Sequence, residues 1–326
     1  MVVRRWIFSC FLVVGTLNIA QSRTAEVHHM GTTNLTAIGW AHAVNSQQKL
    51  NDALSSTVKM IEADIIMGTL VTDKSGKEIP VMGHPPENTS DISLEAFLRQ
   101  ILEHNKKNSE RSKGVKLDFK STKVFKDSLV TLQDLWNLMD YPIWLNADIL
   151  NGPVNATSAK PVDPTEFLAG CKRFDNAVVS IGWTTQWGEN YRNGSYSDND
   201  INNMLEVIGS NNITNSKHKI TFPVRAGIAS NSLQQLKNLY RGLSSTNEVT
   251  LTIWSSKDDY VDIDKLRQLI QSFGVDKVYL DLPEEVSSKL DLVNLCNSAV
   301  SSCFINFSLF TLGMLATSLF VQKYFI

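Results

Sequence analysis

The sequence predicts an α/β fold of the (β/α)₈ barrel (TIM barrel) type, because eight short apolar runs alternate with segments of helical periodicity. Near-continuous apolar runs are typical of parallel strands buried on both faces, and eight such units of this length fit a closed barrel. A doubly wound open sheet is the main alternative, but no glycine-rich phosphate loop follows the first predicted strand. The eight predicted strands are 35–44, 60–67, 115–120, 142–150, 177–185, 218–226, 249–255 and 277–282.

Amphipathic helices are predicted between these strands, where leucine, isoleucine and phenylalanine recur at helical spacing. The clearest periodic segments are 94–102, 129–139, 233–240 and 263–273. Residues that commonly begin helices precede several of the predicted helices, namely Asp91 or Ser93, Asp163 with Pro164, Ser230 or Asn231, and Asp262. The longest connection, 68–90, follows the second strand and contains a turn at 73–76 between two extended pieces.

The two ends of the chain predict a secreted protein held at a membrane. Residues 1–22 combine Arg4 and Arg5 with an apolar run and small residues, which is typical of a secretory signal peptide. Residues 298–326 form a hydrophobic anchor segment that is either a transmembrane span or a signal for a glycosylphosphatidylinositol (GPI) anchor. Residues 30–297 form one ectodomain, and we expect it on the extracellular face of the plasma membrane.

Glycan acceptor sites and cysteines agree with this location. Five asparagines fit the acceptor pattern, which predicts exposed loops in a glycoprotein: Asn34, Asn88, Asn155, Asn193 and Asn212. Cys171 and Cys296 either form a disulfide or leave a free buried thiol. The formal net charge of −2, with no large basic cluster, predicts no nucleic-acid partner.

Polar side chains gather where the predicted strands end. In a barrel the carboxyl ends of the strands and the following loops carry the site. Residues two apart in a strand point to the same face of the sheet. The side chains of Glu62 and Asp64 therefore share a face, and so do those of Asp118 with Lys120 and of Asn146 with Asp148. The residues expected to converge are His42 on strand 1, Glu62 and Asp64 on strand 2, His84 on the following loop, Asp118 and Lys120 on strand 3, and Asn146 and Asp148 on strand 4. Buried carboxylates need a divalent cation or a basic partner, and nearby histidines favour phosphoryl chemistry.

Six separate sequence blocks occur in order between about residues 35 and 285. They are Trp40-Ala41-His42-Ala43-Val44-Asn45-Ser46, Ile61-Glu62-Ala63-Asp64-Ile65, Pro80-Val81-Met82-Gly83-His84-Pro85-Pro86, Lys116-Leu117-Asp118-Phe119-Lys120, Trp144-Leu145-Asn146-Ala147-Asp148-Ile149-Leu150 and Ser180-Ile181-Gly182-Trp183-Thr184-Thr185. Together these blocks resemble the menorin family of secreted or membrane-anchored animal proteins. That family is in turn similar to the phospholipase C-like phosphodiesterases, which include glycerophosphodiester phosphodiesterases and are (β/α)₈ barrels.

The resemblance implies a role for each residue of the site. His42 and His84 are the acid/base pair, with His42 taking a proton from the attacking hydroxyl and His84 protonating the leaving oxygen. The carboxylates of Glu62, Asp64 and Asp118 hold Mg²⁺ or Ca²⁺, and oxygen ligands suit such hard cations. Lys120 becomes a phosphate contact, and apart from the resemblance Asn146, Asp148 and Arg225 are further candidates for substrate binding. The chain departs from the phosphodiesterase pattern at Ala43, where arginine is usual, and at Asp118, where many members have glutamate.

Two functions follow from the resemblance. The first is a cell-surface cue that acts through adhesion molecules or receptors in cell–cell or dendrite patterning. The alternative is an active metal-dependent phosphodiesterase, a hydrolase or lyase acting on a lipid or small phosphodiester. Convergence of the histidines and carboxylates in one open pocket would favour the enzyme, and a plugged pocket would favour the cue. A purely structural alternative is a salt-bridge network of the carboxylates with Lys120 and Arg225.

Overall fold

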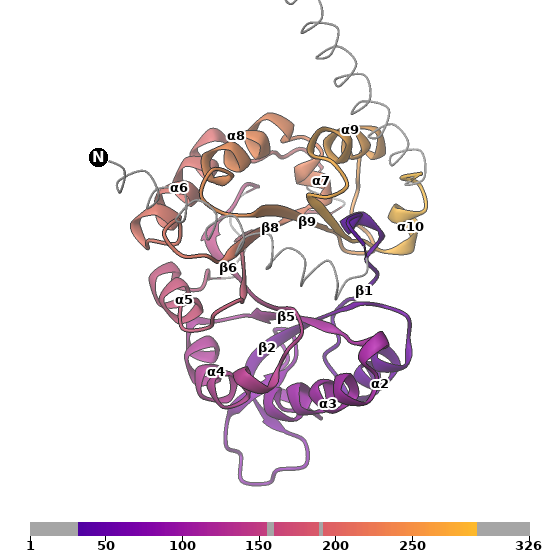
Figure 1. Cartoon of the computed structure of the whole chain (residues 1–326), viewed down its shortest axis with the longest axis vertical. Coiled ribbons are helices and arrows are strands. Elements are labelled where there is room, and N and C mark those ends of the chain that lie inside the picture. The colour runs from indigo at the N-terminus through magenta and orange to yellow at the C-terminus, as the bar shows by residue number, and fades with distance from the viewer. Residues whose placement is uncertain (1–31, 155–159, 189–191, 292–326) are drawn as a thin grey trace, which may run out of the picture.

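The computed structural model describes residues 32–154, 160–188 and 192–291, and these form the predicted barrel (Figure 1). Each strand pairs in parallel with the next in the order β1-β2-β5-β6-β7-β8-β9-β10, and β1 contacts β10 so that the barrel nearly closes. All eight predicted strands are present. They are β1 (Trp40–Ala41), β2 (Met60–Leu70), β5 (Gly114–Phe119), β6 (Ile143–Asn151), β7 (Val178–Thr184), β8 (Lys219–Arg225), β9 (Val249–Trp254) and β10 (Val278–Asp281).

Helices surround the strands in an outer ring (Figure 1). The α-helices are α2 (Gln47–Ser55), α3 (Leu94–Lys107), α4 (Thr122–Leu135), α5 (Pro164–Cys171), α6 (Asp198–Ser210), α7 (Ala226–Ala229), α8 (Leu233–Leu243), α9 (Ile263–Phe273) and α10 (Glu284–Ser287). Ser93 caps α3, Asp163 caps α5 with Pro164 in its first turn, and Asp262 caps α9, as the sequence predicts. The helix α8 instead begins after Ser232, because Ser230 and Asn231 still follow the short α7.

The first strand is much shorter than predicted. Only Trp40 and Ala41 pair with β2, whereas residues 35–37 form the 3₁₀-helix η1 (Leu35–Ala37). The Asn34 side chain accepts a hydrogen bond from the backbone N–H of Thr36, and such local bonds compete with strand pairing. At the other end Ala43 has a φ of 53°, which turns the chain out of the extended conformation.

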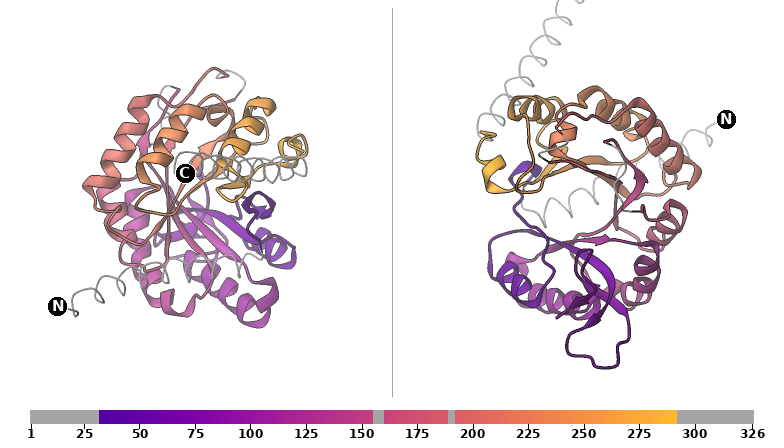
Figure 2. Two further views of the ribbon diagram at one scale, coloured as in Figure 1. Left: turned by 45° about the horizontal axis from the view of Figure 1, so that its top comes forward. Right: turned by 180° about the vertical axis from the view of Figure 1, so that it is seen from behind.

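The long connection after β2 folds back on that strand. β3 (Ile79–Met82) pairs with it in antiparallel orientation, and β4 (Thr89–Ser90) pairs with its end in parallel. Residues 71–78 between β2 and β3 are exposed and project from the barrel (Figure 2). The remaining 3₁₀-helices are η2 (Ser109–Arg111) and η3 (Trp136–Leu138).

Several sequence predictions fall on or beside regions that the structure leaves out. The signal peptide (1–22) and the anchor segment (298–326) lie outside the described residues, as do Asn155 and Cys296. Within those residues no helix is long and apolar enough to cross a membrane. Cys171 is a fully buried free thiol. Asn88, Asn193 and Asn212 are exposed, whereas Asn34 is half-buried, and glycosylation of all five sites stays a prediction.

An aromatic cluster closes the barrel at the amino ends of its strands. The Trp144 ring packs edge-on against Trp40 and Tyr279, at centroid distances of 5.2 and 4.7 Å. Ile38, Met60 and Val178 are the other buried residues of this separate core cluster, and Trp144 is fully buried. Edge-to-face aromatic pairs add stability beyond the area that they bury. Because this end is packed, a ligand must enter from the opposite end.

Truncation of the aromatic cluster should therefore destabilise the whole barrel. We expect Trp144→Ala to lower the free energy of unfolding by about 3–5 kcal/mol, the range for a large aromatic side chain removed from a core. Leu138→Ala is the control, because Leu138 is 49% exposed and its loss should cost well under about 1 kcal/mol. Urea denaturation of the ectodomain measures both, and similar losses in the two variants would contradict the role of the cluster.

Candidate active site and metal centre

A pocket of about 860 Å³ opens at the carboxyl ends of the strands. All nine residues that the sequence predicts for catalysis, metal binding and substrate binding line it: His42, Glu62, Asp64, His84, Asp118, Lys120, Asn146, Asp148 and Arg225. They come from four strands, β2, β5, β6 and β8, and from the loops after β1, β3 and β5. The structure therefore brings the predicted residues together in one open pocket, and their individual roles stay predictions.

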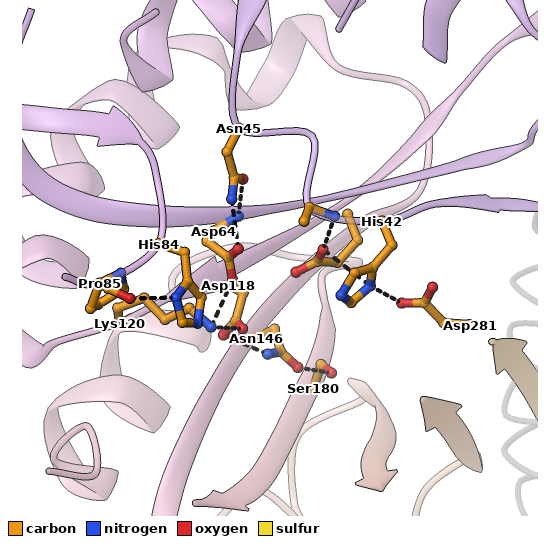
Figure 3. Close-up of polar contacts among 12 residues, drawn as sticks. His42, Asn45, Asp64, His84, Pro85, Asp118, Lys120, Asn146, Ser180 and Asp281 are labelled. Atoms are coloured by element: carbon orange, nitrogen blue, oxygen red, sulfur yellow. Dashed lines mark hydrogen bonds and ion pairs between the residues drawn. The ribbon is translucent and has the colours of Figure 1, made fainter. Parts of the chain in front are cut away.

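Lys120 bridges two of the predicted metal ligands. Its Nζ lies 2.7 Å from Asp64 Oδ1 and 2.6 Å from Asp118 Oδ2 (Figure 3). Burial opposes the charge on both partners of the second pair, but their mutual attraction outweighs it. Consequently the pKa of Lys120 is raised well above its ordinary value and that of Asp118 is lowered. The expected salt-bridge network thus exists around Lys120.

Amide side chains hold the remaining oxygens of these two carboxylates. Asn45 Nδ2 donates to Asp64 Oδ2 at 2.7 Å, and Asn146 Nδ2 donates to Asp118 Oδ1 at 2.7 Å. Ser180 on β7 in turn donates to the Asn146 amide oxygen. Asn146 therefore orients a predicted metal ligand rather than pointing freely into the pocket.

Glu62 is the least compensated of the three carboxylates. Its Oε2 accepts a 2.8 Å hydrogen bond from the backbone N–H of Ala43. Burial, together with the negative charge of Asp64, raises the pKa of Glu62 to about 7. Without a further cation, this buried carboxyl group holds a proton at slightly acid pH.

The donor set fits a hard divalent cation. Glu62, Asp64 and Asp118 can each offer one oxygen, and these oxygens lie within 4.8 Å of one another. Oxygens on opposite sides of a Ca²⁺ ion are about 4.6–5.2 Å apart, and the corresponding distance for Mg²⁺ is about 4.0–4.2 Å. Separations of up to 4.8 Å allow the three oxygens to share one ion of either kind once Lys120 gives up part of its pairing with Asp64 and Asp118. The charge shortage at Glu62 gives such an ion a physical reason to bind.

His42 lies between two buried carboxylates. Its Nδ1 is 2.9 Å from Asp281 Oδ2 on β10 and 3.5 Å from Glu62 Oε2 (Figure 3). Partial burial disfavours the charged ring, but Glu62 and Asp281 outweigh it and raise the pKa of His42 to about 9. The metal-free protein therefore carries His42 as an imidazolium at neutral pH. Nε2 is the nitrogen not committed to Asp281.

His84 is held differently. It is exposed at the pocket rim, and its Nδ1 lies 2.7 Å from the carbonyl oxygen of Pro85 (Figure 3). A carbonyl oxygen only accepts, so Nδ1 carries the proton. In the neutral ring Nε2 then keeps a lone pair. The two histidines thus suit different roles in proton transfer. His42 is protonated and can donate, whereas His84 can accept a proton at Nε2.

Arg225 is bound more tightly than the sequence suggests. Its Nε and Nη2 each donate to Asp259 at 2.7 Å, and its guanidinium carbon lies 5.0 Å from the ring centre of Trp254. It therefore pairs with Asp259 and not with the metal-site carboxylates, contrary to the expected network. Trp254 lines the pocket, whereas the side chains of Trp183 and Tyr279 are buried in the core.

Two further residues belong to the site but are not among those predicted from the sequence. Lys116 lines the pocket, and Asp281 supports it through its bond to His42. Lys116 lies two residues before Asp118 on β5, so the alternation of a strand places it on the inward face. Asp281 ends β10, the position at which the other strands carry their polar residues. Both could be predicted by applying to every strand the two rules used for Asp118 and His42, namely the alternation of faces along a strand and the placement of site residues at its carboxyl end.

The fold and the pocket define a parallel (β/α)₈ barrel with an acidic, histidine-bearing mouth. Residues 34–287 match the Menorin N-terminal domain family. The human protein FAM151B is 36% identical over 248 residues, which cover 76% of this chain and 83% of that protein. The chain therefore belongs to the menorin family, as its sequence blocks predict.

Solved structures with a similar chain course include a glycerophosphoryl diester phosphodiesterase from Parabacteroides distasonis. It is 13% identical, with a TM-score of 0.44, and the match covers 83% of this chain and 92% of that one. The N-terminal domain of a putative aldolase from Bacteroides vulgatus is 10% identical, with a TM-score of 0.41 and coverage of 84% and 88%.

Cation binding should release a proton. Because Glu62 holds a proton below a pKa of about 7, the affinity for Mg²⁺ or Ca²⁺ should rise as the pH increases from 5.5 to 7 and then level off. Asp64→Asn should abolish binding, since it removes a ligand charge. Calorimetry in buffers of different ionisation enthalpy counts the released protons, and Asp148→Asn tests whether they come from the neighbouring carboxyl. An affinity independent of pH, without proton release, would contradict this assignment of Glu62.

Proposed function

We propose that the pocket cleaves phosphodiesters with the help of a divalent cation. The observation that carries the proposal is the convergence of two unlike histidines, three carboxylates and Lys120 in one open pocket. A packed pocket would have favoured a purely binding role. The function remains our inference from this geometry.

Glu62, Asp64 and Asp118 would hold the cation, which supplies positive charge to neutralise a bound phosphate. Lys120, released from part of its pairing, could then contact phosphate oxygens as the resemblance implies. Its short distances to Asp64 and Asp118 place its ammonium group beside the predicted cation. Asn45 and Asn146 keep the two aspartates oriented.

The contacts of the histidines favour a division of labour opposite to the initial expectation. His84 Nε2 would accept the proton of the attacking hydroxyl as its oxygen bonds to phosphorus. His42, whose Nδ1 is bonded to Asp281 and lies 3.5 Å from Glu62, would give a proton to the leaving alcohol oxygen as the old P–O bond breaks. Both protons are then accounted for, and Asp281 acts by positioning His42.

His84→Ala is the clean test of this chemistry. The ring is exposed and bonded only to a backbone carbonyl among the described residues, so its removal should leave the melting temperature unchanged. Loss of a general base should lower phosphodiester cleavage roughly 10²–10⁴-fold. His104→Ala is the matched control, since that ring also contacts a backbone carbonyl, of Arg111, but lies outside the pocket. Unchanged cleavage by His84→Ala would reject its role.

His42→Ala should have a mixed effect. Removal of the ring leaves the buried Asp281 without this partner, which should cost about 1–3 kcal/mol. Cleavage should fall as well if His42 is the acid. Thermal unfolding and a cleavage assay on the same sample separate the two effects. A large loss of stability with no change in cation binding or cleavage would make His42 purely structural.

A second proposal is the cell-surface cue, which needs no catalysis. The exposed connection 71–78 and the exposed acceptor asparagines Asn88 and Asn193 offer surface away from the packed end of the barrel for adhesion molecules or receptors. If the cue is independent of the pocket, Asp64→Asn should leave binding of the ectodomain to responsive cells unchanged while abolishing cleavage. Parallel loss of both activities would instead unite them in one enzyme function.

The same proposal places the protein on the outer face of the plasma membrane. Truncation before Cys303 should release the chain into the medium, because it removes the apolar segment. A phospholipase that cleaves glycolipid anchors distinguishes the two attachment mechanisms. Release by the enzyme excludes a spanning helix, and retention argues for one. Failure of the truncated chain to leave the cells would contradict anchoring by this segment.

A further inference from the structure

Lys116 is a buried lysine that has no partner in the fold and no role in the proposed chemistry. It lies on the inward face of β5 and is only 4% exposed. Among the described residues its ammonium group makes no hydrogen bond and no ion pair, whereas Lys120, on the same side of the chain, pairs with Asp64 and Asp118. An unpaired charge in a buried position costs roughly several kcal/mol, so a ligand is the expected partner.

The side chain of Lys116 starts at the closed end of the pocket. Its neighbours across the strands are Glu62 on β2 and Trp144 on β6, and Trp144 belongs to the aromatic cluster that closes the amino ends of the strands. Lys116 nevertheless lines the pocket, so its side chain extends from this end toward the mouth. The ammonium nitrogen is not enclosed by the described residues, and a ligand in the pocket can reach it.

The positive charge of Lys116 is felt on several sides of the pocket. It acts on His42 after β1, on Glu62 of β2 and on Asp148 of β6. A charge that influences all three elements lies near the middle of the pocket floor. Because no described carboxylate contacts the ammonium group, its three N–H donors stay available to a ligand.

Below neutral pH this ammonium group also lacks a more distant counter-ion. Burial raises the pKa of both Glu62 and Asp148 to about 7, so at a pH of about 6 both carboxyl groups are mostly protonated and neutral. The other carboxylates of the region are paired with cations of their own: Asp64 and Asp118 with Lys120, and Asp281 with His42. Lys116 is then the cation of the pocket without an anion.

We infer that Lys116 is an anion anchor on the pocket floor, which holds the phosphoryl group of a bound phosphodiester before any divalent cation binds. The inference rests on the proposed function for the identity of the anion. A hydrogen bond from an ammonium group to a phosphate oxygen is charge-assisted, and it supplies the anion that Lys116 lacks. The predicted cation would then join a phosphate group that is already held, and would not be needed to recruit it.

Binding of dimethyl phosphate in the presence of EDTA tests the anchor without metal and without turnover. This small phosphodiester is a monoanion at a pH of about 6, so its own titration does not interfere. Titration of the ectodomain, followed by phosphorus NMR, should show saturable binding to the wild type. Lys116→Met should weaken this binding at least about tenfold, which corresponds to about 1.4 kcal/mol. Its melting temperature should not fall, because the substitution removes an unpaired buried charge.

Lys160→Met is the charge-matched control, because Lys160 is exposed and lines the same pocket. Solvent and salt screen its charge, so this variant should lose less than about twofold in affinity. Equal weakening by the two substitutions would overturn the anchor, because the general field of the pocket would then explain the binding. Lys116→Gln replaces Lys116→Met in the comparison if the latter does not fold.

The remaining outcomes separate the anchor from the proposed enzyme function. Binding of dimethyl phosphate only after Mg²⁺ is added would overturn the anchor and leave metal-dependent cleavage intact. A lower melting temperature of Lys116→Met with unchanged binding would also overturn it, and would make Lys116 a structural counter-ion. Binding in EDTA that depends on Lys116, in a protein that cleaves no phosphodiester, would support the anchor and reject the enzyme.

Discussion

Charge compensation inside the barrel mouth is the constraint on which the rest of the site depends. Five carboxyl groups, those of Glu62, Asp64, Asp118, Asp148 and Asp281, lie within a small and largely buried region. Lys116, Lys120 and the imidazolium of His42 oppose these negative charges, and Arg225, which is paired with Asp259, acts on Asp148 as well. Isolated buried charges are strongly unfavourable, so the shortage must be met by protons, by a metal ion or by a ligand. The raised pKa values of Glu62 and Asp148 show where the shortage falls.

This distribution links folding to chemistry. The amide groups of Asn45 and Asn146 hold Asp64 and Asp118 in fixed directions, so these two aspartates are ready-made ligands. Glu62 lacks such a side-chain amide and carries the excess negative charge instead. The same excess keeps His42 protonated, which couples the predicted cation site to the predicted proton donor. A cation that binds at Glu62 would offset this negative charge. It would therefore lower the pKa of His42 and make the ring give up its proton more readily.

The sequence predicts the barrel and most of the pocket because both follow from simple periodicities. Strand runs and the two-residue alternation place Glu62 with Asp64, and Asp118 with Lys120, on inward faces. Contacts between elements distant in the chain are harder to predict. The pairing of His42 with Asp281, 239 residues later, depends on barrel closure. Arg225 pairs with Asp259, which lies on a loop without a recognisable sequence pattern. The first strand is shortened at one end by local hydrogen bonds of the Asn34 side chain with Thr36 and at the other by the positive φ of Ala43.

The left-handed turn at Ala43 has a consequence for how the site can be observed. The backbone N–H of Ala43 donates to Glu62 Oε2, and the backbone N–H of Asp64 donates to the Asn45 side chain. The short connection after β1 therefore contacts both metal-ligand candidates. These two backbone protons exchange with solvent only when that connection opens. Their hydrogen-exchange rates should therefore report the free energy of opening the mouth of the barrel, and the measurement needs no substrate or label.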